Sequence, residues 1–241
     1  MTIAIYLKED TVKTRQLRKR RDRAFFALVA ALGLAAVSFA IWPLLVWQAK
    51  TLPRLTAKVE QAPIPQGLVL SEKSTLEANV QVVEDPDGFS YFSTNYKPAG
   101  PRPVQFQLTI PKLKIKDATV KVDNLNFYTS LSHFPGSALP GDIGNAFITG
   151  HSVLPQFADP ENYRAIFTEL SDLQVGDDIY VGMAGQTFRY VVQYLKVVDP
   201  RDLSVLAPIS QNGRNLTLMT CVPPGTNTKR LVVITSLLFT K

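Results

Sequence analysis

The chain has 241 residues, 46% of them hydrophobic, which is enough for one globular domain with accessory segments. Its formal net charge is +6, but residues 1–23 alone hold eight basic and three acidic side chains, a net +5. The rest of the chain is therefore near neutral, which argues against nucleic acid as a partner of the folded part. The single cysteine excludes an intrachain disulfide.

The N-terminal part predicts a membrane anchor. Residues 24–47 carry no charged side chain, and at ~1.5 Å per residue they would extend about 36 Å, enough to cross a hydrocarbon core of ~30 Å. Basic residues 1–23 precede this segment, so the positive-inside rule makes them a cytoplasmic tail. A cleaved signal peptide is the alternative, but its apolar region would be only ~7–15 residues long. We therefore expect a retained single-pass anchor in the lipid of the cell membrane, with the remainder outside.

Residues 48–103 are expected to form a Pro-rich extracytoplasmic stalk, with an N-terminal extension of the next domain as an alternative. Proline resists both regular helix and central strand. Within this segment only Val80 to Val83 is predicted as a strand. The prolines are Pro53, Pro63, Pro65, Pro86, Pro98, Pro101 and Pro103.

Residues 104–241 show short β-type runs separated by turn residues, typical of an all-β barrel or sandwich. The predicted strand runs are 104–110, 118–122, 145–149, 178–183, 186–198, 216–220 and 231–239. A hairpin is expected to turn at Gly185. One short helix is predicted from Tyr163 to Leu170, because Ile166, Phe167 and Leu170 are spaced to share a face. No Gly-rich phosphate loop follows a strand, so a nucleotide-binding fold is not indicated.

Three residues suggest thiol chemistry. Cys221 ends one apolar run and Arg230 opens the next, so adjacent strands would place them face to face at the same barrel end. His151 follows another strand run and can act as the base or cation that a thiol needs. Arginine beside a nucleophile can stabilise an oxyanion. Each residue also has a plainer interpretation: a buried small apolar residue, a loop histidine or a solvated charge.

These residues resemble the signature motifs of the sortase family. Thr217-Leu218-Met219-Thr220-Cys221 followed by Arg230 is similar to the Thr-Leu-X-Thr-Cys…Arg motif, and Asn145 to His151 resembles the histidine motif. The resemblance covers residues 104–241 and does not separate the housekeeping-like from the pilin-type class. It implies a closed eight-stranded β-barrel with one or two short helices.

The resemblance also implies a cysteine transpeptidase. Cys221 would attack a C-terminal sorting motif similar to Leu-Pro-X-Thr-Gly and form a thioester. His151 would transfer protons, and Arg230 would position the substrate and stabilise the oxyanion. Thr220 and His133 are weaker candidates for substrate binding, with a structural hydrogen bond as the alternative role of His133. The implied partners are proteins with a C-terminal sorting signal, and an amine acceptor from a peptidoglycan precursor or a pilin lysine.

Several alternatives remain at this stage. A thiol hydrolase would release the same acyl group to water, and a noncatalytic anchored barrel would only bind peptide or wall material. Residues 85–89, Asp-Pro-Asp-Gly-Phe, fit an ordinary turn or the inhibitory lid of some pilin-type sortases. No cofactor is expected. Calcium is bound by some sortases, but the available carboxylates have no loop-type calcium spacing; they are Asp117, Glu161, Asp172, Asp177 and Asp178.

Overall fold

The computed structural model describes residues 9–59, 80–84, 90–98, 100–210 and 212–238, and divides into two units, residues 1–45 and 46–241. The helices are α1 (Glu9–Val46), the π-helix η1 (Trp47–Thr51), α2 (Leu52–Val59) and the 3-10 helices η4 (Pro111–Leu113), η5 (Pro155–Phe157), η6 (Leu170–Asp172) and η7 (Leu203–Leu206). The strands are β1 (Val80–Glu84), β2 (Ser90–Thr94), β3 (Gln105–Ile110), β4 (Ile115–Lys121), β5 (Leu131–His133), β6 (Gly144–Thr149), β7 (Asp178–Met183), β8 (Gln186–Val198), β9 (Arg214–Val222) and β10 (Lys229–Leu237).

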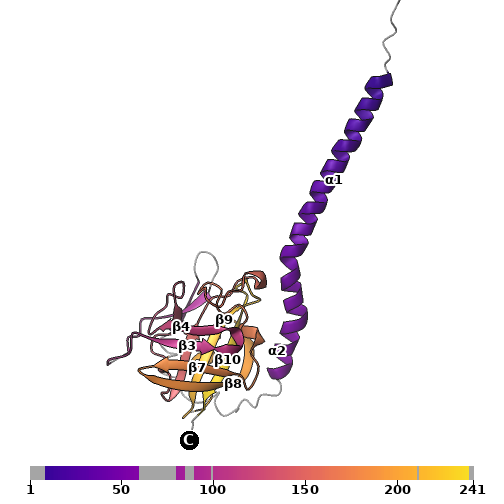
Figure 1. The fold of residues 1–241 in the computed structure, drawn as a ribbon. Coiled ribbons are helices and arrows are strands. Elements are labelled where there is room, and N and C mark those ends of the chain that lie inside the picture. Colours follow the sequence, from indigo (N-terminus) through magenta and orange to yellow (C-terminus); the bar gives the residue numbers. More distant parts are fainter. Residues whose placement is uncertain (1–8, 60–79, 85–89, 99, 211, 239–241) are drawn as a thin grey trace, which may run out of the picture. The chain divides into compact units, whose positions relative to one another are not determined.

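The first unit is made of helix α1, which contains most of the predicted membrane segment (Figure 1). Among the described residues this is the one helix that is long and apolar enough to cross a membrane. Pro43 lies near its end. An N-terminal apolar helix of this kind fits the expected single-pass anchor.

The second unit contains a closed barrel of eight strands in the order β10-β8-β7-β3-β4-β5-β6-β9 (Figure 1). Closure leaves no unpaired strand edge, which removes the risk of edge-to-edge aggregation. The predicted hairpin joins β7 to β8, and its turn residues Ala184 and Gly185 have φ angles of 51° and 77°. Two consecutive positive φ angles are those of a type I′ turn, whose twist matches that of the flanking strands. The eight-stranded barrel predicted from the sequence is thus confirmed.

The barrel has apolar side chains on both faces of β6, β9 and β10. Side chains alternate along a strand, so Leu216 and Leu218 of β9 point into the central core, where Tyr190 is also fully buried. Met219 of β9 and Phe147 of β6 belong instead to a second cluster. We call this second cluster the outer core; its buried members are Val80, Phe92, Phe134, Phe147, Val198, Val205, Leu206, Met219, Val232 and Ile234.

The hairpin of β1 and β2 helps to cover the outer core. Phe92 of β2 is buried, and its ring centroid lies 6.4 Å from that of Phe134 and 6.1 Å from that of Phe147. Glu84 of β1 pairs with Arg201 at 3.3 Å. The hairpin therefore contributes side chains to the folded unit, although it lies within the segment expected to be a stalk. The predicted strand from Val80 to Val83 forms part of β1.

The segment directly after α1 also packs on the barrel. Trp47 and Leu55 are buried members of the central core cluster, and α2 contacts β8. Removing residues 1–47, the predicted tail and anchor, would take Trp47 away from this cluster. The domain limits of the sequence analysis stay predictions, but the contacts favour keeping residue 46 onward in any soluble form.

The structure differs from the sequence prediction at residues 163–170. Residues 163–170 do not form the predicted α-helix: Thr168 N–H donates to Ala165 O and Leu170 N–H to Phe167 O, which are three-residue bonds of successive turns. The apolar face was predicted correctly, because Ile166, Phe167 and Leu170 are buried. Residues 85–89, for which a turn and a lid were both considered, lie outside the described residues.

Truncating Phe92 tests the packing of the hairpin. Phe92→Ala should lower the free energy of unfolding by about 3 kcal/mol, because a buried aromatic ring leaves a cavity when removed. Denaturant unfolding of residues 46–241 can be followed through Trp47, the one tryptophan of this fragment. Tyr96→Ala is the matched control, since Tyr96 is exposed and its loss should cost under about 0.5 kcal/mol. Equal effects of both substitutions would contradict this packing.

Candidate active site

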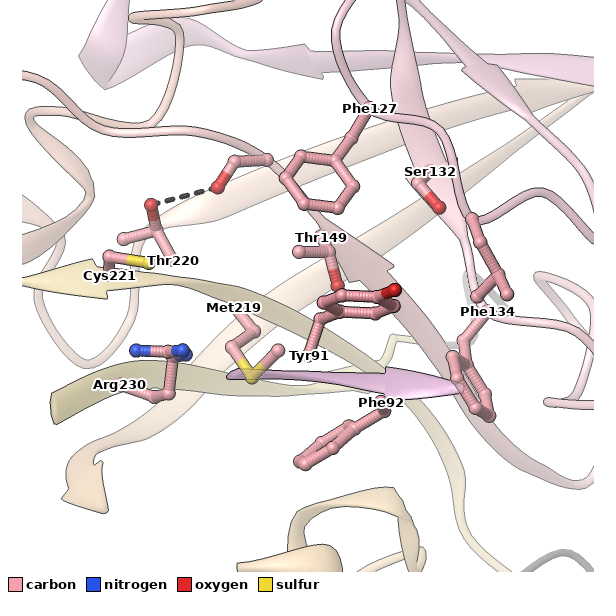
Figure 2. A pocket seen from close by; sticks show the side chains of 12 residues that line it. Tyr91, Phe92, Phe127, Ser132, Phe134, Thr149, Met219, Thr220, Cys221 and Arg230 are labelled. Atoms are coloured by element: carbon pink, nitrogen blue, oxygen red, sulfur yellow. Dashed lines mark hydrogen bonds between the residues drawn. The ribbon is translucent and has the colours of Figure 1, made fainter. Parts of the chain in front are cut away.

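The register of β9 and β10 places Cys221 opposite Arg230. The two strands are antiparallel, and Arg230 pairs directly with Cys221. Directly opposed residues project from the same face of a sheet, so the two side chains are neighbours, as predicted from the sequence. Figure 2 shows them side by side at one end of a pocket, with Met219 farther along the same face.

The register of β6 and β9 brings His151 to the same level from the other side. These strands are parallel, and Thr149 of β6 pairs with Met219. Strand β6 ends at Thr149, two residues before His151, and β9 reaches Cys221 two residues after Met219. Gly150 N–H donates to Met219 O at 3.2 Å, and the Thr220 hydroxyl donates to Gly150 O at 2.9 Å, the bond drawn in Figure 2. Cys221 thus lies opposite Arg230 on one adjacent strand, and His151 follows the end of the other; Cys221 and His151 line the same open cavity.

Gly150 is required by packing. A Cβ atom at this position would lie 2.6 Å from side-chain atoms of both Leu131 and Phe167. The Phe167 N–H also donates to His151 O at 3.0 Å, and the Ser152 hydroxyl donates to Cys221 O at 2.7 Å. Glycine at position 150 therefore lets the segment that carries His151 pack closely against the barrel wall.

Two cavities meet at Cys221. The first is an enclosed pocket of about 30 Å³, too small for a peptide side chain, lined by Tyr91, Phe92, Leu125, Phe127, Ser132, Phe134, Thr149, Gly150, Met219, Thr220, Cys221 and Arg230. The second is an open cleft of about 1080 Å³, lined by Tyr91, Ser93, Leu125, Asn126, Phe127, Tyr128, His151, Ser152, Val153, Leu154, Phe157, Cys221, Gly225, Thr226 and Asn227. Below, these are called the enclosed pocket and the open cleft.

The β1–β2 hairpin contributes to both cavities, which the sequence did not reveal. Tyr91 lines the enclosed pocket and the open cleft, and Phe92 lines the enclosed pocket (Figure 2). These rings occupy space next to Cys221. Their only signal in the sequence is the apolar Tyr91-Phe92 pair in an otherwise polar stretch.

Burial and charge act in opposite directions on Cys221. The side chain is 7% exposed, and burial raises the pKa of its thiol, while the positive charge of Arg230 lowers it. Arg230 is 2% exposed, and its own pKa is lowered by burial. Its Nη1 donates to Asn227 O at 2.8 Å and Lys229 O at 3.1 Å, which fixes the guanidinium beside the thiol. The resting form of Cys221 at neutral pH is the thiol.

His151 is neutral at pH 7. Burial, with a smaller contribution from Arg164, lowers the pKa of its imidazole to about 4. Its Nε2 is buried and accepts or donates no hydrogen bond among the described residues. The rings of Phe127 and Tyr128 lie 4.3 and 4.9 Å away, centroid to centroid. A neutral imidazole with an unengaged nitrogen can accept a proton, although the lowered pKa makes this one a weaker base than a free histidine.

The two weaker candidates lie in different surroundings. Thr220 lines the enclosed pocket, and its hydroxyl is committed to Gly150 O. His133 is fully buried and lines neither cavity. Its Nε2 lies 2.8 Å from Ala138 O and 3.0 Å from the Ser137 hydroxyl, and burial lowers its pKa to about 4. The structure thus places Thr220, but not His133, beside Cys221.

The carboxylates weighed for calcium are engaged elsewhere or dispersed. Asp177 pairs with Lys112 at 2.7 Å, and Asp178 pairs with Arg189 at 2.8 Å. Within the part of the chain that the structure describes, no group of three or more His, Cys, Asp or Glu side chains is placed to hold a metal ion.

The reactivity of the single cysteine tests this electrostatic balance. The alkylation rate of Cys221 by iodoacetamide should rise with pH along a curve displaced above that of an ordinary thiol, because burial raises its pKa. Arg230→Gln should displace the curve further upward, and Arg230→Lys, which keeps the charge, should displace it less. A curve below that of a free thiol, or one indifferent to the charge at position 230, would contradict the assignment.

A family model described as a sortase domain matches residues 108–238. Among solved structures, the chain is similar to a lid mutant of sortase A from Corynebacterium diphtheriae, with 32% identity over 59% of this chain and 74% of that one, and a TM-score of 0.49. It is similar to sortase C-1 from Actinomyces oris, with 27% identity over 56% and 74% of the two chains and a TM-score of 0.48.

A further similar structure is a sortase D5 transpeptidase from Clostridium perfringens, with 24% identity over 56% of this chain and 79% of that one, and a TM-score of 0.47. No match was found among curated proteins. Since the family model covers more than half of the sequence, the chain belongs to the sortase family.

Proposed function

We propose that this chain is a membrane-anchored cysteine transpeptidase. It cleaves a C-terminal sorting motif similar to Leu-Pro-X-Thr-Gly and transfers the acyl group to an amine of a peptidoglycan precursor or a pilin. The observation that carries the proposal is the strand register that sets Cys221 between Arg230 and the end of the strand leading to His151. The family membership supports the same chemistry.

In the first half-reaction, His151 takes the thiol proton and Cys221 sulfur attacks the scissile carbonyl carbon. A carbon–sulfur bond forms and the carbonyl oxygen becomes an oxyanion, which the guanidinium of Arg230 stabilises. The intermediate then collapses, the carbon–nitrogen bond breaks, and His151 returns the proton to the departing amine. The product is a thioester on Cys221.

In the second half-reaction, an acceptor amine attacks the thioester. His151 accepts the proton that the amine loses, the carbon–sulfur bond breaks, and the sulfur leaves as a thiolate that is reprotonated. Water in place of the amine would give hydrolysis, so the open cleft, which adjoins both His151 and Cys221, is where the two outcomes are separated.

The anchor determines where this chemistry takes place. Helix α1 is apolar enough to span a bilayer, and the basic residues at its N-terminal side favour a cytoplasmic N-terminus. The catalytic unit then lies on the outer face of the cell membrane, where substrates held by a C-terminal apolar segment present their sorting motifs.

Entry of a substrate side chain into the enclosed pocket requires the hairpin to move. The enclosed pocket of about 30 Å³ has Tyr91 and Phe92 in its lining. A substrate side chain that reaches Cys221 from this direction must displace at least one of these rings. The hairpin therefore restrains acylation by substrates that must fill the enclosed pocket.

Mass spectrometry of the full chain in detergent, with a panel of sorting-motif peptides, tests the proposed reaction. A thioester adduct should form on Cys221 and move to an added amine such as triglycine. Cys221→Ala should form no adduct, and Arg230→Gln should reduce the rate by about 10²–10³, as expected for loss of an oxyanion partner. An adduct released only to water identifies the thiol hydrolase. A thiol that reacts with iodoacetamide but with no peptide favours the noncatalytic barrel.

Tyr91→Ala tests the restraint by the hairpin. Removing this ring should speed acylation by a good peptide several-fold, because the path to Cys221 opens. Tyr96→Ala is the control and should leave the rate unchanged, because Tyr96 is exposed and lies two residues beyond the end of β2. A slower reaction of Tyr91→Ala would show that the ring supports substrate binding instead.

A further inference from the structure

The loop after β4 holds two adjacent aromatic side chains in a fixed position. Asn126 N–H donates to the Asn124 side-chain oxygen at 3.1 Å, and Tyr128 N–H donates to the Asn126 side-chain oxygen at 3.0 Å. The Asn124 amide also donates to Asn126 O at 2.6 Å. Asparagine side chains that bond the backbone two residues on form successive Asx turns. This loop therefore presents Phe127 and Tyr128 in a defined geometry.

Both rings contact His151. The centroid of the imidazole lies 4.3 Å from that of Phe127 and 4.9 Å from that of Tyr128, at the same interplanar angle of 48°. The two rings are parallel to one another, 2° apart in orientation and 6.0 Å between centroids. The imidazole thus packs closely against a surface made of two parallel rings, as aromatic side chains commonly do.

Arg164 supports this surface from the turns that follow η5. Its guanidinium carbon lies 5.5 Å from the centroid of Tyr128, within cation–π distance. The backbone of Arg164 is held in turn, because its N–H donates to the Asn162 side-chain oxygen at 3.0 Å. A permanent positive charge is therefore held over the ring of Tyr128, near enough to His151 to disfavour its protonation.

We propose that Phe127, Tyr128 and Arg164 are positioning residues that orient the imidazole of His151 and shield it from water at the Cys221 side of the open cleft. The two rings exclude water from His151, and Arg164 both holds Tyr128 and disfavours a second cation nearby. This proposal rests on the proposed function of His151 in proton transfer. It assigns the aromatic pair a role beyond forming the wall of the cleft.

The charges around His151 agree with this role. The titratable groups on the surrounding elements are the Tyr128 phenol, the Arg164 guanidinium, the Cys221 thiol and, one strand further, Arg230. Burial is the larger cause and Arg164 the smaller cause of the lowered pKa of His151, and no carboxylate of the described residues opposes them. Because protonation is shifted to low pH, His151 stays neutral across the range in which an ordinary histidine titrates.

The chain contains only two histidines, so their protonation can be followed directly by NMR. The full chain, labelled with ¹³C at histidine and kept in detergent, is titrated between pH 3.5 and 8. The His151 signal is assigned by its absence in His151→Gln. We expect the parent His151 to titrate near pH 4, with C–H protons displaced by the ring currents of Phe127 and Tyr128.

Three changes separate orientation, desolvation and charge. Arg164→Gln should raise the pKa of His151, and Phe127→Leu combined with Tyr128→Leu should raise it and abolish the ring-current displacement. Tyr128→Phe keeps the ring and should preserve both the parent pKa of His151 and the ring-current displacement. Arg189→Gln removes a cation that pairs with Asp178 and should change nothing. Tyr128 is 55% exposed and Arg164 is on the surface, so these substitutions leave the core intact.

The titration decides the proposal independently of any turnover. If His151 titrates near 6.5 in the parent, or if neither Arg164→Gln nor the double leucine variant moves its pKa, the positioning role is wrong. If these shifts occur but no peptide is transferred, the proposed function fails and the geometry stands. If transfer is observed, the low-pH limb of kcat/KM should move to higher pH in the two shifted variants and stay in place in Tyr128→Phe.

Discussion

The register of β9 between its two neighbours is the constraint on which the site depends. This strand pairs in parallel with β6 and antiparallel with β10, and eight of its nine residues are buried. A slip of one residue would turn Cys221 to the other face of the sheet and bury Leu218 or Leu216 on the wrong side. Because apolar clusters lie on both faces, such a slip would disrupt two cores at once. The relative placement of Cys221 and Arg230 is therefore maintained by hydrophobic packing.

The outer core links the stability of the barrel to the access of substrate to Cys221. Met219 and Phe147 project from the barrel and must be covered by other elements. The β1–β2 hairpin supplies part of that cover with Phe92, and its neighbour Tyr91 thereby comes to lie in both cavities beside Cys221. Any motion that opens the enclosed pocket exposes apolar surface of the outer core. A peptide that binds in the opened pocket must therefore make contacts that offset the free-energy cost of exposing this surface.

The sequence predicted the barrel strands, the hairpin at Gly185 and the pairing of Cys221 with Arg230, because each depends on short-range patterns of alternation and turn residues. It did not predict the three-residue strand β5, whose formation depends on neighbours from β4 and β6. The buried face of residues 163–170 was predicted correctly, but these residues form turns with three-residue hydrogen bonds and not an α-helix. The rings of Phe127 and Tyr128 against His151 join segments more than twenty residues apart, a contact that only the tertiary structure determines.

In the resting site Cys221 and His151 are both neutral, and different neighbours act on the pKa of each. Burial raises the pKa of Cys221 and lowers that of His151, so each effect opposes formation of the thiolate–imidazolium pair. Arg230 acts in the opposite sense on Cys221 alone, while Arg164 acts on His151 against protonation. The two arginines therefore make the thiol more acidic and the imidazole less basic. Burial of both groups keeps Cys221 protonated until a carbonyl oxygen arrives beside Arg230, where the developing negative charge favours proton transfer to His151.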